Sequence, residues 1–405
     1  MKSFLRGLIR GLLFLLPVLF ISCGIFYVSY LKNAPGQEES SKEPLLSEET
    51  VPVSAGDVSS MPVTDIPDAS EAPVSPKPGE APENDKEPEE AFGPVTLTFA
   101  GDILFTEYPL SGYQARGISS LVSDELLAYM TGSDLFMLNE EFPFSTRGEA
   151  AADKQYTFRV DPSYVRIFQE LGVDIATVAN NHALDFGTEA FTDSLDTLDA
   201  AGIARVGGGR NLEEAKAPVI REISGYTIGI LGASRVIPVS SWAAGKQHPG
   251  MFTTYDPSLL TQEIQNLKNS CDDVAVYVHW GIEKDTIPQD YQRQLACAYI
   301  DAGADMVIGS HPHVMQGFEY YHGKPIAYSL GNFLFSNSSN ETVLYRITIE
   351  TDGSLTPSII PCTRSNGQMQ IMASPNDFFS RLSGLSFHAS VEASGDGNAY
   401  ILEQP

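Results

Sequence analysis

The stretch "VANNHALDFG" at residues 178–187 places two amides and an imidazole directly after a run with the composition of a buried strand. Residues 173–179 are mostly apolar and partly β-branched, which is typical of a strand in a sheet core. Asn180, Asn181 and His182 then follow in succession, with Asp185 and Gly187 close behind. Amides and imidazoles are costly to bury without partners. This position therefore predicts turn chemistry, a ligand or a metal.

The same pattern recurs along the chain, because apolar runs end in polar residues at five places and helical patterns lie between them. Strands are expected at 94–102, 133–141, 173–182, 272–281 and 305–314, helices at 162–172, 188–202 and 289–304, a β-rich stretch near 218–233, and hairpins over 324–335, 342–353 and 354–362. Alternating strands and helices predict α/β layers. Ligands in such sheets gather at the carboxyl ends of strands, so the five polar strand ends are expected to form one site.

The segment "SHPHV" at residues 310–314 carries two of the seven histidines of the chain. In an extended segment the side chains at positions i and i+2 point the same way, so His311 and His313 are expected to present both imidazoles to one point. Pro312 favours this arrangement because it disfavours the α conformation of the residue before it. The alternative is a solvent-exposed loop with incidental histidines.

Carboxylates and imidazoles together predict a site for one or two divalent metal ions. Asp102 and Glu141 supply oxygen ligands and the strand-end histidines supply nitrogen ligands, a mixture that suits Mn, Fe, Zn or Mg. A thiolate-rich site is not expected, because no cysteine lies in these segments. Cys271 and Cys297 are candidates for a disulfide, which the sequence leaves open.

The order of the motifs resembles that of the CapA family, whose proteins take part in poly-γ-glutamate capsule biosynthesis. The matching motifs lie between about 95 and 336 and read "GD", "NEE", "ANNHALDFG", "HWGIE", "GSHPHV" and "YSLGNFLF". That family is similar in fold to calcineurin-like metallophosphoesterases. The resemblance therefore implies a four-layer α/β/β/α sandwich over 94–405. It also implies a role in making, exporting or attaching poly-γ-glutamate or a similar anionic polymer, alongside membrane polymer-synthase subunits.

The resemblance also implies roles for individual residues. The metal ligands it implies are Asp102, Glu141, Asn181, His279, His311 and His313. His182 matches the imidazole that stabilises or protonates a leaving group. Asn139 accompanies Glu141 in an N-x-E motif, and Asn332 is expected in the wall of the site.

Three residues next to these are expected to have separate roles. Asp185 is expected either to orient a neighbouring imidazole or to cap the helix that begins near Gly187, and capping is favoured. Asn180 is expected to satisfy the backbone at the strand's end. Glu140 is expected to be solvated.

One departure from the wider phosphoesterases limits the inference about activity. Their first motif is Asp-x-His, whereas Ile103 and Leu104 follow Asp102 here, so one imidazole ligand is missing. Two alternatives to a polymer-biosynthesis component therefore stay open. One is a surface metallophosphoesterase with a phosphorylated substrate, and the other is a non-catalytic scaffold with a vestigial site.

Residues 1–33 predict a membrane anchor. Lys2, Arg6 and Arg10 precede residues 11–31, which carry no charge. A helix of that length spans roughly 30 Å, the thickness of a hydrocarbon core. Basic residues before the span predict a cytoplasmic N-terminus and an extracellular location for the rest of the chain. A cleaved signal peptide and a lipoprotein processed at Cys23 are the less favoured alternatives.

Residues 34–93 predict a disordered, acidic and proline-rich linker. They contain 15 Asp or Glu residues, three Lys residues and ten prolines, a composition that buries too little apolar surface to offset the entropy of ordering. The linker contributes −12 and the first 33 residues +4 to the net charge of −27, which leaves −19 for residues 94–405. A domain this acidic argues against nucleic acid as a partner. An anionic polymer would need bridging cations.

Overall fold

The computed structural model describes residues 93–152, 154–335 and 341–405, which lie in one compact unit. The anchor expected at 11–31 lies outside the described residues, and so does the linker expected at 34–93, apart from Gly93. Within the described ranges, no helix is both long and apolar enough to cross a membrane. The anchor therefore stays a prediction.

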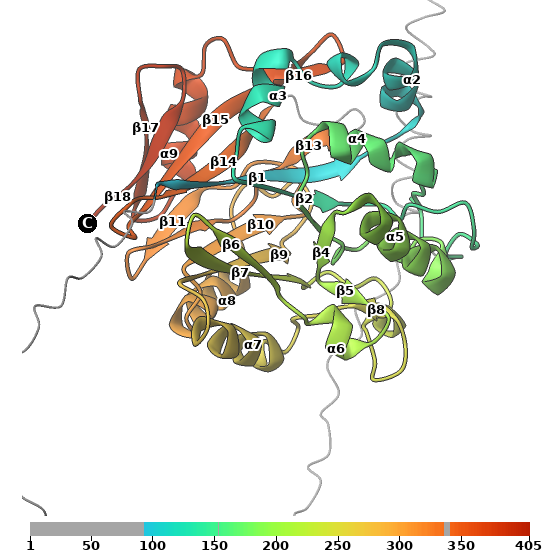
Figure 1. Cartoon of the computed structure of the whole chain (residues 1–405). Helices are drawn as coiled ribbons and strands as arrows, with labels where there is room; N and C mark the ends of the chain where they lie inside the picture. The colour runs from blue at the N-terminus through green and yellow to red at the C-terminus, as the bar shows by residue number, and fades with distance from the viewer. Residues whose placement is uncertain (1–92, 153, 336–340) are drawn as a thin grey trace, which may run out of the picture. The chain divides into compact units, whose positions relative to one another are not determined.

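The larger of two main sheets has ten strands, which pair in parallel at one end of its main path and antiparallel over the rest of it (Figure 1). In spatial order the main path is β17 (Ala389–Ala393), β18 (Ala399–Glu403), β15 (Leu355–Ser365), β14 (Glu341–Ile349), β1 (Val95–Leu104), β2 (Leu135–Glu140), β3 (Ile175–Thr177) and β4 (Ala204–Val206). Two further strands join it: β13 (Asn332–Phe335) pairs with β1, and β16 (Gln368–Ile371) pairs with β15.

The second main sheet has six strands, with a parallel centre and antiparallel edges. Its order is β11 (Phe318–Tyr321), β12 (Lys324–Ala327), β10 (Met306–Ser310), β9 (Asp273–His279), β7 (Tyr226–Ser234) and β6 (Val219–Ile223). A separate two-stranded ribbon pairs β5 (Gly208–Gly209) with β8 (Gly250–Met251).

Helices cover the outer faces of both sheets (Figure 1). The α-helices in the described residues are α2 (Glu107–Arg116), α3 (Asp124–Thr131), α4 (Val165–Glu170), α5 (Gly187–Ala201), α6 (Leu212–Ala215), α7 (Ser258–Lys268), α8 (Asp290–Asp301) and α9 (Asn376–Leu385), of which α9 packs its apolar side into the cluster shared by the inner faces of the two sheets. The apolar sides of α3, α4 and α5 pack on the larger sheet, and those of α7 and α8 pack on the smaller one.

The inner faces of the two sheets pack against each other, and strand periodicity explains how. On β9, Val274, Val276 and Val278 face the helices, whereas Ala275 and Tyr277 face the other sheet, because successive side chains of a strand point to opposite faces. The Tyr277 hydroxyl also donates to the carbonyl of Ala100 on β1, at 2.8 Å. The described domain therefore has the expected α/β/β/α layer order.

The carboxylates of aspartates just before four strands bond to neighbouring strands. Each accepts a hydrogen bond from a main-chain N–H on the strand beside it: Asp134 from Thr96, Asp174 from Phe136, Asp272 from Thr227 and Asp305 from Val274, at 2.7–2.9 Å. These contacts lie at the amino ends of the strands, opposite the ends at which the site was expected.

Most of the expected elements are present, with differences where pairing is long-range. The strand expected at 173–182 is short, because β3 ends at Thr177 and the chain then turns. The expected hairpin over 324–335 is wrong, since β12 pairs with β11 and β13 runs parallel to β1. Cys271 and Cys297 are both free thiols, so no disulfide joins them.

Candidate metal centre

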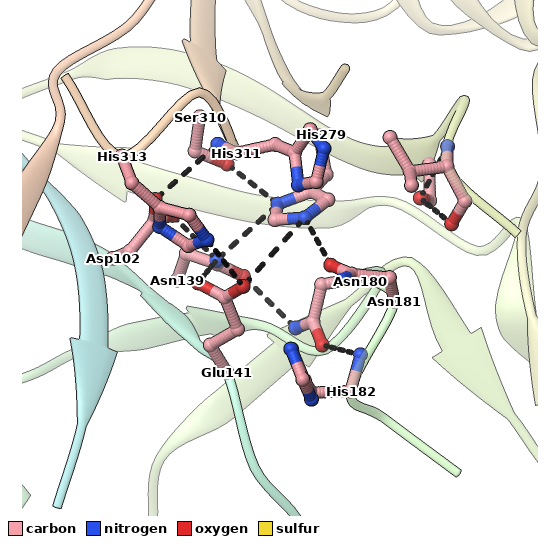
Figure 2. A network of polar contacts seen from close by, with 12 residues as sticks. Asp102, Asn139, Glu141, Asn180, Asn181, His182, His279, Ser310, His311 and His313 are labelled. Carbon is pink, nitrogen blue, oxygen red and sulfur yellow. Dashed lines mark hydrogen bonds and ion pairs between the residues drawn. The ribbon is translucent and has the colours of Figure 1, made fainter. Parts of the chain in front are cut away.

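The candidate site lies where the carboxyl ends of strands from both sheets meet. Figure 2 shows the side chains of Asp102, Glu141, His279 and His313 pointing toward one another. Asp102 lies near the end of β1, where Gly101 allows a close approach, because a Cβ there would lie 1.9 Å from the carbonyl oxygen of Gly331. That carbonyl accepts a hydrogen bond from the Asp102 N–H at 2.9 Å. The bond places β13 beside the site.

Asn139, at the end of β2, joins the elements of the larger sheet. Its Nδ2 donates to Asp102 Oδ1 at 2.8 Å, and its Oδ1 accepts from Asn180 Nδ2 at 3.0 Å. Asn180 also donates to the Glu140 carbonyl at 2.7 Å and accepts from the His182 N–H at 3.0 Å. Asn180 thus satisfies backbone groups as expected, and it also holds Asn139 in place.

His313 lies between the two buried carboxylates of the site. Its Nδ1 is 3.2 Å from Asp102 Oδ2 and 2.8 Å from Asn332 Oδ1, and its Nε2 is 3.7 Å from Glu141 Oε1. Burial alone would lower the pKa of His313, but Glu141 and Asp102 outweigh it and raise that pKa to about 10. Asn332 lies in the wall of the site, next to this ring.

His279, the last residue of β9, is fully buried and held at both ring nitrogens. Its Nε2 is 2.8 Å from Asn181 Oδ1, and its Nδ1 is 3.0 Å from the Ser310 hydroxyl. Burial, reinforced by the nearby His311, lowers its pKa well below the ordinary value, so the ring is neutral. A neutral imidazole is the form that binds metal ions.

Two buried polar atoms at the centre of the site have no hydrogen-bond partner among the described residues: Glu141 Oε1 and His311 Nδ1. Donor atoms of Glu141, His311 and His313 lie within 4.8 Å of one another. Burial, followed by the charge of Asp102, raises the pKa of Glu141 well above its ordinary value, and burial lowers that of His311 to about 3. A divalent cation would satisfy both unpartnered atoms and offset the paired carboxylates, so these residues fit a metal.

A second group adjoins this cluster and contains a residue that sequence reasoning missed. His182 Nδ1 is 2.7 Å from Asp185 Oδ2, which also accepts from the Phe158 N–H at 2.7 Å. Lys154 lies 2.9 Å from the same ring nitrogen and contacts Asp185 Oδ1 and the Asn181 carbonyl. Burial lowers the pKa of Lys154. Its position in a loop without periodicity gave no signal in the sequence.

The structure corrects three expectations about local geometry. His311 and His313 do not lie in an extended segment, since their φ angles are +98° and +59°. β10 ends at Ser310, and the turn brings the His311 N–H to 3.3 Å from Asp102 Oδ2. The two rings still approach one another, with centroids 5.7 Å apart. A long-range contact and a turn, rather than strand alternation, therefore bring the rings together.

The other two corrections concern carboxylates. Asp185 does not cap α5, whose N-cap is Phe186 with no side-chain hydrogen bond, so its contact is with His182. Glu140 is not solvated: it is 1% exposed and bonds to the Ser194 hydroxyl. Burial raises its pKa well above the ordinary value.

Comparison with known proteins gives two relatives with capsule-related names. The PGA biosynthesis protein CapA of Bacillus subtilis (strain 168) is 34% identical over 250 residues, which cover 61% of this chain and 65% of that protein. The capsule biosynthesis protein CapA of Bacillus anthracis is 29% identical over 293 residues, covering 70% of this chain and 71% of that protein. The chain thus spans about two thirds of the length of these relatives.

A solved structure, the NAD nucleotidase of Haemophilus influenzae, matches 73% of this chain and 64% of its own at 10% identity, with a TM-score of 0.39. Similarity at that level supports no functional comparison. The family model of the bacterial capsule synthesis protein PGA_cap, in contrast, matches residues 96–337, which is more than half of the chain. The resemblance seen in the motifs is thereby confirmed, and the chain belongs to the PGA_cap family of bacterial capsule synthesis proteins.

Proposed function

We propose that this chain is a cell-surface component of the biosynthesis, export or attachment of poly-γ-glutamate or a similar anionic polymer, and that a divalent metal supports this role. Family membership and the names of the two Bacillus relatives support the polymer. The uncharged stretch at 11–31 supports membrane anchoring. Polymer-synthase subunits in the same membrane are the partners that we propose with this role.

The observation that carries the metal is the pair of unpartnered buried atoms, Glu141 Oε1 and His311 Nδ1. Buried polar groups in proteins almost always have hydrogen-bond partners. Two atoms without such partners in the group of Glu141, His311 and His313 therefore indicate a ligand. Glu141, His311 and His313 would hold the ion, and its binding would release the proton that the carboxylates favour on His313. Asp102, His279 and Asn181 lie beside them. Mn, Fe, Zn or Mg suits these ligands, and when bound it would act as a Lewis acid on an oxygen of the substrate.

The chain's own residues would orient the substrate and move a proton. Asp185 and Lys154 both contact His182 at Nδ1. They fix the ring, and Nε2 is left as the atom that can exchange a proton with a leaving group. This fixed imidazole beside a metal cluster also favours a second candidate function, a surface metallophosphoesterase with an unknown phosphorylated substrate.

The first test is the metal content of the purified full-length chain, beside the double variant His311→Ala/His313→Ala. We expect about one or two ions per chain, lost in the double variant. His322→Ala is the matched control, because that side chain is 69% exposed and pairs with the exposed carboxylate of Asp301. No metal in the unaltered chain after incubation with Mn or Zn would contradict the metal site and favour a scaffold.

The second test measures surface polymer in cells that carry the same variants. Loss of polymer with the double variant and normal polymer with the control would support the proposed role. Normal polymer with both variants would contradict a metal-dependent role in its synthesis. Hydrolysis of a phosphodiester by the purified chain, abolished by the double variant, would instead favour the second candidate.

A further inference from the structure

We propose that a cavity beside the candidate metal centre binds a γ-linked glutamate segment, with Arg159 taking a carboxylate and neutral polar side chains taking the amides. This inference rests on the proposed function and names a subsite for its polymer. The cavity has a volume of about 530 Å³ and is lined in part by Ser111, Gln114, Thr157, Phe158 and Arg159. Cavities of roughly 300–1,000 Å³ are typical of small-molecule sites.

The cavity adjoins the residues that would carry out chemistry. Phe158, which lines it, packs its ring against His182 with centroids 4.6 Å apart. The main-chain N–H of the same residue donates to Asp185 Oδ2 at 2.7 Å. A ligand in the cavity would therefore lie one side chain away from the imidazole, which is the relation expected of a subsite next to a reacting centre.

Arg159 is held in place by neutral groups. Its Nη1 donates to the carbonyls of Arg147 and Gly148 at 2.6 and 3.2 Å, and its guanidinium lies 4.2 Å from the centroid of the Phe186 ring. Within the described part of the chain, no acidic side chain forms an ion pair with it. Arg147, in the same loop, pairs with Glu189 and Asp193 instead. An arginine fixed by neutral groups keeps its charge available for a ligand carboxylate.

The rest of the lining favours a carboxylate joined to an amide over a more highly charged anion. Thr157, Ser111 and Gln114 offer neutral donors and acceptors of the kind that pair with amides. The exposed carboxylate of Glu107 also lines the cavity, so it balances Arg159 and offers an acceptor for an amide N–H. A phosphate or pyrophosphate group would be attracted by Arg159 but repelled by the carboxylate of Glu107. A γ-glutamyl unit could place its carboxylate at Arg159 and its amide N–H at Glu107.

The experiment measures binding of a short γ-linked glutamate oligomer to the full-length chain by titration calorimetry, with inorganic phosphate as the competing probe. We expect saturable binding that Arg159→Gln weakens about tenfold, since a charge-assisted hydrogen bond is lost. Arg221→Gln is the matched control and should leave binding unchanged. Arg221 also donates to a carbonyl, that of Ile220, and it lies on β6, in the other sheet.

A second variant distinguishes a loss of binding from a loss of folded structure in Arg159→Gln. Ser111→Trp fills the cavity from the exposed side of α2 without changing the charge, and we expect it to weaken binding at least fivefold while the melting temperature stays unchanged. Equal binding by the unaltered chain, Arg159→Gln and Ser111→Trp would overturn the proposal. Competition by phosphate at the concentrations at which the oligomer binds would overturn the choice of ligand.

The outcome is separable from that of the proposed function. If the unaltered chain does not bind the oligomer, while the double histidine variant still abolishes surface polymer in cells, the subsite is wrong and the proposed function stands. If the oligomer binds as expected and the double histidine variant leaves polymer formation unchanged, the subsite is supported and the metal-dependent role is wrong.

Discussion

The amino and carboxyl ends of the parallel strands use buried carboxylates in opposite ways. At the amino end of β10, Asp305 accepts hydrogen bonds from the Val274 N–H at 2.9 Å and from Lys268 and Lys324, both at 2.7 Å. At the carboxyl ends, Glu141 is equally buried, yet its Oε1 has no hydrogen-bond partner among the described residues. Both carboxylates are buried, but Asp305 lies beside two lysines, whereas Glu141 lies beside a second carboxylate, Asp102. The missing partner, and not burial, is therefore what distinguishes a ligand site from a structural contact.

The largest effect is expected at the amino end, from Asp305→Ala. This change leaves the Val274 N–H buried without an acceptor and removes the partner of two lysines, which should lower the free energy of unfolding by about 3 kcal/mol. Asp305→Asn keeps an acceptor and should cost less. Urea unfolding of the purified variants measures both. If Asp305→Ala and Asp305→Asn lower the free energy of unfolding equally, the carboxylate stabilises the fold through the two lysines and not through the Val274 N–H.

The opposite sign is expected at the carboxyl end, from Glu141→Gln in metal-free protein. Burial and the charge of Asp102 raise the pKa of Glu141, so its stability contribution is lost as the pH rises through that raised pKa. Glutamine does not ionise, and His313 keeps Asp102 as its partner at 3.2 Å. The variant should gain about 2 kcal/mol of unfolding free energy at pH 8 in EDTA.

Addition of metal should reverse that order. The unaltered chain should be stabilised by Mn or Zn, whereas Glu141→Gln should not respond, because the amide is a weaker ligand than the carboxylate. The same unfolding experiment, repeated with and without the metal, checks this. A metal-free variant less stable than the unaltered chain would show that Glu141 is structural, as Asp305 is.

The comparison of the two strand ends also shows which features could be predicted from the sequence. The polar residues at five strand ends were predicted to converge, and Asp102, Glu141, His279, His311 and His313 do lie together. This succeeds because the carboxyl ends of parallel strands share an edge. α5 was predicted for a similarly local reason: its apolar positions have helical spacing, and Gly202 follows with the left-handed backbone of a C-cap.

Features that depend on long-range contacts could not be predicted. The positive φ angles of His311 and His313 accompany a turn toward Asp102, about two hundred residues away. Lys154 reaches His182 from a loop with no periodic pattern, and β13 pairs with β1 across the chain. For Asp185 the less favoured alternative, contact with an imidazole, is the one present, and the burial of Glu140 was missed. Neither outcome could be decided from the sequence, because the partners His182 and Ser194 are brought close only by the folded chain.

A pH-dependent effect is expected from Asp273→Asn, at the start of β9. Burial, reinforced by Asp305, raises the pKa of Asp273 from 3.8 to about 6. Stability from this group is complete below about pH 4 and is lost as the pH rises through 6. The variant should therefore match the unaltered chain near pH 4 and exceed it by about 1–2 kcal/mol at pH 8. Unfolding curves at the two pH values measure this, and a gain at pH 4 would contradict it.

The smallest effect is expected from Asp134→Ala, at the amino end of β2. Its carboxylate accepts from the Thr96 N–H at 2.8 Å in an exposed position, so water can replace it and the loss should be about 0.5–1 kcal/mol. Metal content and surface polymer should not change, because the residue lies at the end of the strands away from Glu141 and His311. This variant tests the separation of the two ends most directly: a change in metal content with stability intact would show that the amino ends also shape the site.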